Sequence, residues 1–211
     1  MEATLKTFDV CLKAVNDADS AQGLLDAVED LAELKDERAI DPLIQVLGFN
    51  NPGAAVAAVE GLIQIGIPAV SPILETLDGY NYGARAWAIR ALAGIGDPRG
   101  QRLLLNAAAN DFSLSVRRAA ARGLGAIRWH EIQETERDGA MERSQTILLQ
   151  VTQDEEWVVR YAAIVGLEAL ALKLNDREKI CHSLCQLKEK DPTAAVQARA
   201  QWALEKIEHE R

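Results

Sequence analysis

The sequence has few of the features that define several large classes of protein. Only three of its 211 residues are cysteine, an odd number without a framework spacing, which argues against a disulfide-stabilised domain and fits a reducing compartment. No apolar run approaches the roughly 18 residues that a transmembrane helix needs. The first nine residues also lack the basic and apolar regions of a secretory signal. We therefore expect a cytoplasmic protein with no membrane insertion.

Positive charge is also scarce. The chain has 23 Lys and Arg against 32 Asp and Glu, which gives a net charge of -9. Because phosphate contacts need an excess of positive potential, nucleic acid is not an expected partner. Aromatic residues make up only 5% of the chain, whereas we count 34 alanines and 26 leucines. Small side chains at this density are typical of helices that pack closely against one another.

An internal repeat organises the chain. Five segments share small residues at helical spacing and end on a leucine, and a degenerate copy ends at Leu31; the five segments are 54–62, 84–92, 116–124, 159–167 and 196–204. Most copies are preceded by another helical segment, as at 39–47 and 69–77, so each copy is the second helix of a pair. Pro42 and Pro72 are expected near the starts of the first helices. No part of the chain has the pattern of a strand ladder.

A period of about 30 residues per helix pair predicts an all-α fold, an α-solenoid of about six short HEAT-like repeats. We expect a single domain over residues 1–211, with the closing leucines 62, 92, 124, 167 and 204 buried. One longer spacing, of 43 residues, is explained by a charged insertion at about 129–143. The pattern does not decide whether this insertion is a loop or an extended helix end.

Three arginines recur at one position of the second helices. With Leu92 at the centre of the buried stripe, Arg85 falls on the packed face, and Arg117 and Arg160 take the same position in later repeats. Each follows an aspartate by six or seven residues: Asp78, Asp111 and Asp154. We interpret these arginines as a structural ladder that satisfies carboxylates and helix-end groups between repeats.

The opposite face of the same helices collects arginine and aromatic residues. By helical periodicity it carries Trp87, Arg90, Arg118, Arg122, Tyr161, Arg199 and Trp202, and the turn before the first of them contains Tyr80 and Tyr82. An arginine fork suits a carboxylate, and an aromatic face suits a planar conjugated ligand. Two alternatives stay open: a solvated face of long side chains, and tyrosines that only cover the core between repeats.

Sequence signatures of catalysis are missing. The chain contains neither a glycine-rich phosphate loop nor a Gly-x-Ser-x-Gly turn. Cys181 and Cys185 would form half of a zinc site without a second pair, so we expect no metal and interpret both as small buried residues. If the protein assists a reaction, the nucleophile comes from elsewhere and the repeats supply positioning.

Residues 50–128 resemble a known family. Asn50–Val59, Asp78–Arg99 and Asp111–Leu124 are similar to the E/F-type phycobilin lyases, and within them to the F, or beta, subunits. The specific part is the tyrosine-rich turn followed by Ala-Arg-Ala-Trp-Ala-Ile-Arg-Ala-Leu at 84–92. A related branch that also isomerises the bilin carries an Asn-His-Cys motif, which this sequence lacks.

The resemblance implies a lyase subunit that works as a heterodimer with an E, or alpha, subunit. The pair would attach phycocyanobilin through a thioether to a cysteine of the phycocyanin alpha subunit, with the bilin as transferred substrate and no tightly bound cofactor. The bilin-binding residues would be Tyr80, Tyr82, Trp87, Arg90, Arg118, Arg122 and Tyr161. Two alternatives are a non-enzymatic adaptor in phycobilisome assembly or degradation, and a generic repeat protein that binds a peptide.

Overall fold

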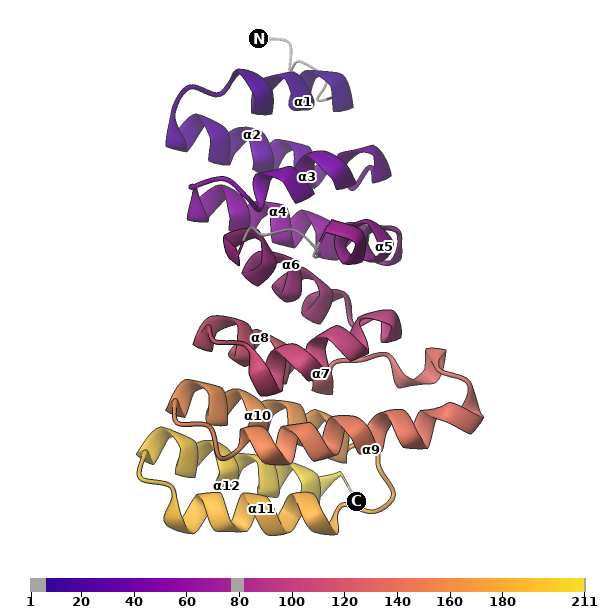
Figure 1. Ribbon diagram of the computed structural model, residues 1–211, viewed down its shortest axis with the longest axis vertical. Coiled ribbons are helices and arrows are strands. Elements are labelled where there is room, and N and C mark those ends of the chain that lie inside the picture. The colour runs from indigo at the N-terminus through magenta and orange to yellow at the C-terminus, as the bar shows by residue number, and fades with distance from the viewer. Residues whose placement is uncertain (1–6, 77–81, 211) are drawn as a thin grey trace. The chain divides into compact units, whose positions relative to one another are not determined.

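A computed structural model of the chain describes residues 7–76 and 82–210, with the Tyr82 side chain left out (Figure 1). Its described residues form twelve α-helices and three short 3-10 helices, without a strand. The all-α, helix-pair repeat fold predicted from the sequence is therefore confirmed, with six pairs. By its internal packing the chain divides into two compact units, Met1–Ile95 and Gly96–Arg211. The single domain expected over 1–211 stays a prediction.

The first unit contains three helix pairs. Their bounds are α1 Phe8–Asp17, α2 Ala21–Glu33, η1 Glu37–Ala39, α3 Ile40–Val46, α4 Pro52–Ile65, α5 Ile67–Thr76 and α6 Tyr82–Ile95. The second helices α2, α4 and α6 pack against one another in chain order, and α3 packs on α4 and α5. Each pair leaves an apolar face that only the neighbouring pair can bury, so the core runs continuously through the unit.

Local sequence explains where these helices begin. The Asn51 side chain caps α4 by accepting a hydrogen bond from the Ala54 N–H, and it donates another to the Ala21 carbonyl at the start of α2. Pro42 lies in the first turn of α3, as expected. The corresponding prediction for Pro72 was wrong. Because α5 already begins at Ile67, Pro72 lies inside that helix.

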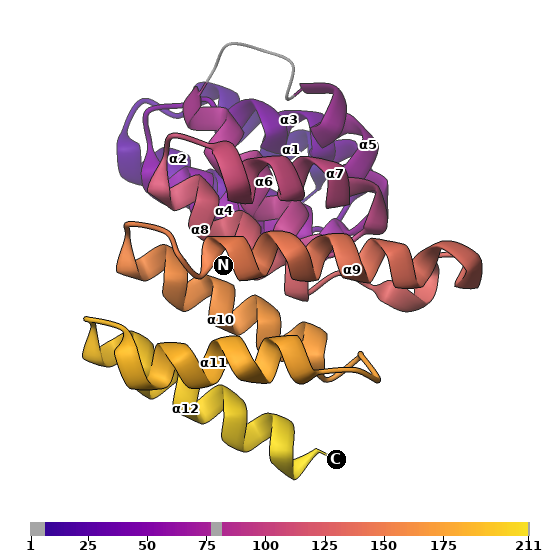
Figure 2. The same ribbon diagram turned by 60° about the horizontal axis from the view of Figure 1, so that its bottom comes forward.

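The second unit contains the other three pairs. Its elements are η2 Pro98–Gly100, α7 Gln101–Asn110, α8 Leu114–Gly125, η3 Trp129–Glu131, α9 Glu134–Val151, α10 Trp157–Ala171, α11 Glu178–Lys190 and α12 Ala194–His209. Figure 2 shows α9 to α12 lying side by side. The first helices α7, α9 and α11 form one layer and the second helices α8, α10 and α12 form the other. The charged segment at 129–143 is the short η3 and the first half of α9, so it is largely helical.

Small residues let the second helices approach closely. A Cβ added to Gly125 of α8 would lie 2.5 Å from the Gly166 carbonyl oxygen of α10, closer than real Cβ atoms come. The closing leucines Leu62, Leu92, Leu124 and Leu167 are buried, as predicted. Leu204 is only half-buried, because no further helix follows α12 in the described residues; Ala203 and Ile207 are buried in its place.

Candidate functional site

The arginines predicted to form a ladder make two kinds of contact. Arg117 of α8 donates from Nε to Asp154 Oδ2 at 2.7 Å and from Nη1 to the Asp111 carbonyl at 3.0 Å. Arg160 of α10 repeats this arrangement with the Asp191 carboxylate, at 2.7 Å, and the Asp154 carbonyl, at 2.8 Å. Each arginine thus holds the backbone of its own repeat and the carboxylate of the next one. These bonds lock consecutive repeats in register.

The details differ from the simplest form of the ladder. Asp154 offers its carbonyl to Arg160, the arginine that follows it, while its carboxylate binds Arg117 of the preceding repeat. In the last repeat Gln197 takes the ladder position and keeps only the carbonyl contact, donating to the Asp191 carbonyl at 2.7 Å. Arg85 is half-buried, and its expected partner Asp78 lies outside the described residues.

In the first unit, the candidate ligand residues lie on α6. Arg90 is exposed, and its Cζ lies 5.2 Å from the ring centroid of Trp87, within cation–π range. Trp87 was expected on the exposed side but is half-buried. Tyr80 lies outside the described residues, and the Tyr82 side chain is not described.

In the second unit, the candidate residues lie on neighbouring second helices. Arg118 and Arg122 of α8 are exposed, and neither makes a hydrogen bond or ion pair within the described part of the chain. Tyr161 of α10 is half-buried, with its ring 5.8 Å from the Cζ of Arg199. Two arginines with unused donors can bind the carboxylates of a ligand. The alignment of these residues with Trp87 and Arg90 into one strip stays a prediction, because the two groups belong to different units.

Arg199 of α12 was expected on the exposed face, and this prediction was wrong. It is only 7% exposed, and its Nη2 lies 2.7 Å from Oε2 of Glu168 on α10. Lys206 donates to the other oxygen of Glu168 at 3.1 Å. Trp202 remains 63% exposed beside Arg199, with its ring centroid 5.3 Å from the Cζ.

Sequence reasoning missed this cluster. Glu168 is the one acidic residue in the otherwise apolar segment 157–172, which also contains Arg160. An isolated carboxylate beside the closing leucine Leu167 requires a cation from a neighbouring helix if it is to be buried. Glu168 in this apolar segment was therefore the sequence signal that could have indicated a buried ion pair.

The remaining candidates are the two cysteines and the histidine of α11. Cys181 is half-buried, but Cys185 is exposed, so the expectation that both are buried was wrong; on α11 they lie one helical turn apart. The His182 ring lies 3.0 Å from the Gln186 amide. Among the described residues no three His, Cys, Asp or Glu side chains come together in a way that could hold a metal ion. No helix in the described ranges has the length and apolarity to cross a membrane.

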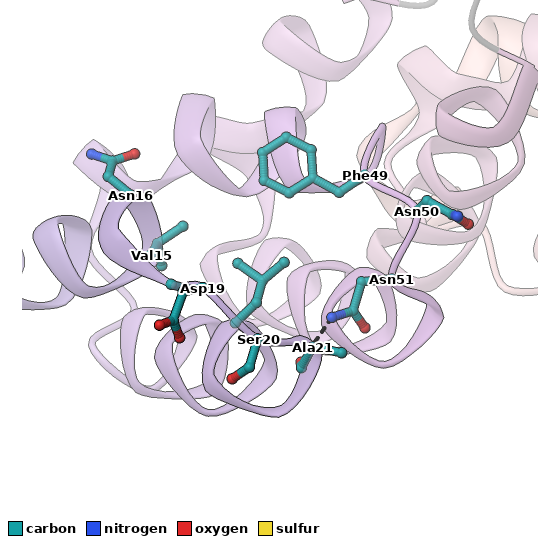
Figure 3. A pocket seen from close by; sticks show the side chains of 10 residues that line it. Val15, Asn16, Asp19, Ser20, Ala21, Phe49, Asn50 and Asn51 are labelled. Carbon is teal, nitrogen blue, oxygen red and sulfur yellow. Dashed lines mark hydrogen bonds between the residues drawn. The ribbon is translucent and has the colours of Figure 1, made fainter.

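One cavity lies between the first two repeats, where the loops after α1 and α3 come together (Figure 3). It has a volume of about 510 Å3 and is lined by Val15, Asn16, Ala18, Asp19, Ser20, Ala21, Leu24, Phe49, Asn50 and Asn51. In Figure 3 the Asn51 amide is hydrogen-bonded to the Ala21 carbonyl, while the Phe49 ring borders the opening. The lining contains one charged side chain, that of Asp19, and no cation, which makes the cavity a poor match for an anionic ligand.

The comparisons with known proteins agree on the kind of repeat. A family model described as HEAT repeats matches residues 70–168, and one described as PBS lyase HEAT-like repeat matches residues 14–49. A Synechocystis protein named phycocyanin alpha phycocyanobilin lyase CpcF is 51% identical over 197 residues, covering 93% of this chain and 92% of its own. A Nostoc protein named phycocyanobilin lyase subunit beta is 46% identical, covering 86% and 91% respectively.

A solved structure is similar in both sequence and fold. It is the complex of CpcE and CpcF of phycocyanin lyase from Nostoc, with a TM-score of 0.76 and 46% identity. The match covers 80% of this chain and 99% of the matched one.

Proposed function

Because the chain belongs to the phycocyanobilin lyase beta-subunit family, we propose that it is the beta subunit of a heterodimeric lyase that transfers phycocyanobilin to the phycocyanin alpha subunit. Its partner is the E, or alpha, subunit, and the pair works in the cytoplasm. The observation that carries the proposal is the 46% identity over nearly the whole length of a chain solved in a CpcE–CpcF complex. The bilin is the transferred substrate.

The reaction places modest chemical demands on this chain. The cysteine thiol of the acceptor adds across the ethylidene double bond of the bilin, so that a carbon–sulfur bond forms and the thiol proton ends on the adjoining ring carbon. Nothing is oxidised or reduced. The attacking sulfur belongs to the acceptor, so the lyase contributes by holding the bilin in reach and in the correct orientation.

The candidate residues suit that role. The bilin is an open-chain tetrapyrrole with two propionates and a conjugated face. Exposed Arg90, Arg118 and Arg122 offer donors for the carboxylates, and Trp87 and Tyr161 offer aromatic faces. Tyr80 and Tyr82 belong to the same proposed site. A carboxylate bound through an arginine leaves the ethylidene end of the molecule open to the thiol.

Co-expression tests the proposal. The chain, its E subunit and the phycocyanin alpha subunit are produced together in a bacterium that synthesises phycocyanobilin, and covalent bilin on the acceptor is read by zinc-enhanced fluorescence in a denaturing gel. We expect a coloured acceptor only when both subunits are present. An acceptor that is equally coloured without this chain would contradict the proposal. A non-enzymatic adaptor would increase the amount of phycocyanin without changing the bound fraction of bilin.

A further inference from the structure

The cluster around Arg199 contains a donor that no group of the described residues satisfies. Its Nη2 is paired with Glu168, but its Nη1 is buried and has no hydrogen-bond partner within the described residues. A buried guanidinium N–H without an acceptor is unfavourable, because it has given up water without gaining a replacement. The other arginines on buried sites, Arg117 and Arg160, use Nη1 on backbone carbonyls.

The charge of the cluster is unbalanced in the same sense. Arg199 and Lys206 together carry two positive charges, and both bind the single carboxylate of Glu168. These ion pairs therefore leave one positive charge without a carboxylate of its own, although the protein as a whole has a net charge of -9. A carboxylate is the anion whose planar geometry suits the remaining edge of a guanidinium.

Two aromatic rings lie against the Arg199 guanidinium. Tyr161 and Trp202 have their ring centroids 5.8 and 5.3 Å from the Cζ of Arg199. Tyr161 is half-buried on α10, whereas Trp202 is mostly exposed on α12, so Trp202 is the neighbour that can turn aside to admit a ligand. Rings beside an arginine form a site for a molecule that carries both a carboxylate and a conjugated plane.

We propose that Arg199 Nη1 binds a propionate of the bilin, with Trp202 as the movable ring that covers it. This inference rests on the proposed function and adds a second-unit anchor to it, on α10 and α12. Glu168 is a positioning residue, because it pairs with Nη2 of Arg199, and Lys206 in turn holds Glu168 through its other carboxylate oxygen.

Direct binding tests the anchor without requiring transfer. Phycocyanobilin and its dimethyl ester, which lacks both negative charges, are titrated into the complex of this chain with its E subunit, and binding is followed by bilin absorbance. In the unchanged complex the ester should bind more weakly than the free acid. The ratio of the two dissociation constants, ester over acid, is the ester penalty. In Arg199→Gln that penalty should shrink by about tenfold, since one charge-assisted bond is lost. An equal ester penalty in both complexes would overturn the proposal.

Three further variants cover the case in which Arg199→Gln fails to fold. Arg199→Lys keeps the charge opposite Glu168 but removes Nη1, and the ester penalty should shrink in the same way. Trp202→Ala should weaken binding of both acid and ester several-fold, whereas Trp157→Ala, which removes another exposed tryptophan from the start of α10, should change neither. Equal affinities for Trp202→Ala and Trp157→Ala would overturn the role of Trp202.

The same titration separates this proposal from the proposed function. If the unchanged complex transfers bilin normally and the Arg199 variants keep the full ester penalty, only the anchor is wrong. If the complex binds bilin through Arg199 but colours no acceptor, the anchor stands and the lyase assignment fails.

Discussion

Arg160 and Asp191 are joined by two hydrogen bonds, of 2.7 and 3.0 Å, across 31 residues of sequence. The Arg160 side chain is 10% exposed and the Asp191 side chain 2%. The pair connects α10 to the turn that begins α12, and the arginine also closes its own preceding turn. Removing either partner would leave the other charge buried and unpaired.

We therefore expect Arg160→Ala to lower the free energy of unfolding by about 3–5 kcal/mol, the range found when one partner of a buried pair is removed. Urea denaturation followed by circular dichroism measures this. Arg118→Ala is the matched comparison, because Arg118 is exposed on α8 and has no partner there. That variant should stay within about 0.5 kcal/mol of the original chain. Similar losses in the two variants would show that the ladder adds no stability.

The same pair predicts how stability depends on pH. Burial opposes ionisation of Asp191, but hydrogen bonds from Arg160 and from the Thr193 N–H more than offset it and hold the pKa of this carboxyl below its ordinary value. A carboxyl whose pKa is lower in the folded state stabilises the fold above its unfolded pKa, near 4. This contribution is lost as the pH falls from there through the folded pKa.

Melting temperatures recorded from pH 7 down to pH 3 should accordingly fall below about pH 4. Asp191→Asn should melt at a lower temperature at neutral pH and lose less on acidification. A variant that shows the same acid-induced loss as the original chain would place the responsible carboxyl elsewhere.

Close contact between α8 and α10 gives a prediction about packing. Gly125→Ala would put a methyl group 2.5 Å from the Gly166 carbonyl oxygen, and backbone cannot yield without separating the helices. We expect a loss of about 1–3 kcal/mol. Gly139→Ala of α9 is the comparison, because its methyl would meet only the flexible end of Arg143, at 3.4 Å. That change should stabilise by up to about 1 kcal/mol through helix propensity. Thermal or urea unfolding of the two variants measures both changes in stability.

Exposed Arg90 of α6 is expected to affect transfer rather than folding. Arg90→Ala should lower the rate of bilin transfer by about tenfold to a hundredfold, the equivalent of one charge-assisted bond, with an unchanged melting temperature. Trp87→Ala should also lower transfer, and because Trp87 is half-buried it should in addition lower the melting temperature without unfolding the protein. Arg85→Ala should lower the melting temperature, because Arg85 is half-buried. Full transfer by both Arg90→Ala and Trp87→Ala would remove α6 from the site.

The regular parts of the fold could be predicted because the same residue pattern recurs in several repeats. Leu92 is buried as predicted, and Leu62, Leu124 and Leu167 are buried because each has a following helix in its own unit to cover it. The prediction was wrong for Leu204, because no helix follows α12 among the described residues. Periodicity defines which face of a helix a residue lies on, but burial also depends on the neighbouring helix.

Arg199 shows the same limit for the candidate site. Its helical position predicts an exposed arginine, like Arg90 and Arg118. It is buried instead, because Glu168 lies opposite it on α10 and compensates its charge. Helical position in one repeat does not reveal a partner 31 residues away. Conversely, Arg117 and Arg160 were placed on the packed face from spacing alone. Their carboxylate partners, Asp154 and Asp191, belong to the following repeat and are not the aspartates that precede each arginine in the sequence.

The proposed function requires that this chain and its E subunit together direct bilin to the thiol of another protein. Purified chain, E subunit, phycocyanobilin and apo-phycocyanin alpha subunit are mixed, digested and examined by mass spectrometry for cysteine peptides that carry the bilin mass. We expect the adduct on the acceptor cysteine alone, formed only with both subunits present, and none on Cys11, Cys181 or Cys185. Stable bilin on one of these three cysteines, or equal labelling of the acceptor when this chain is omitted, would contradict it.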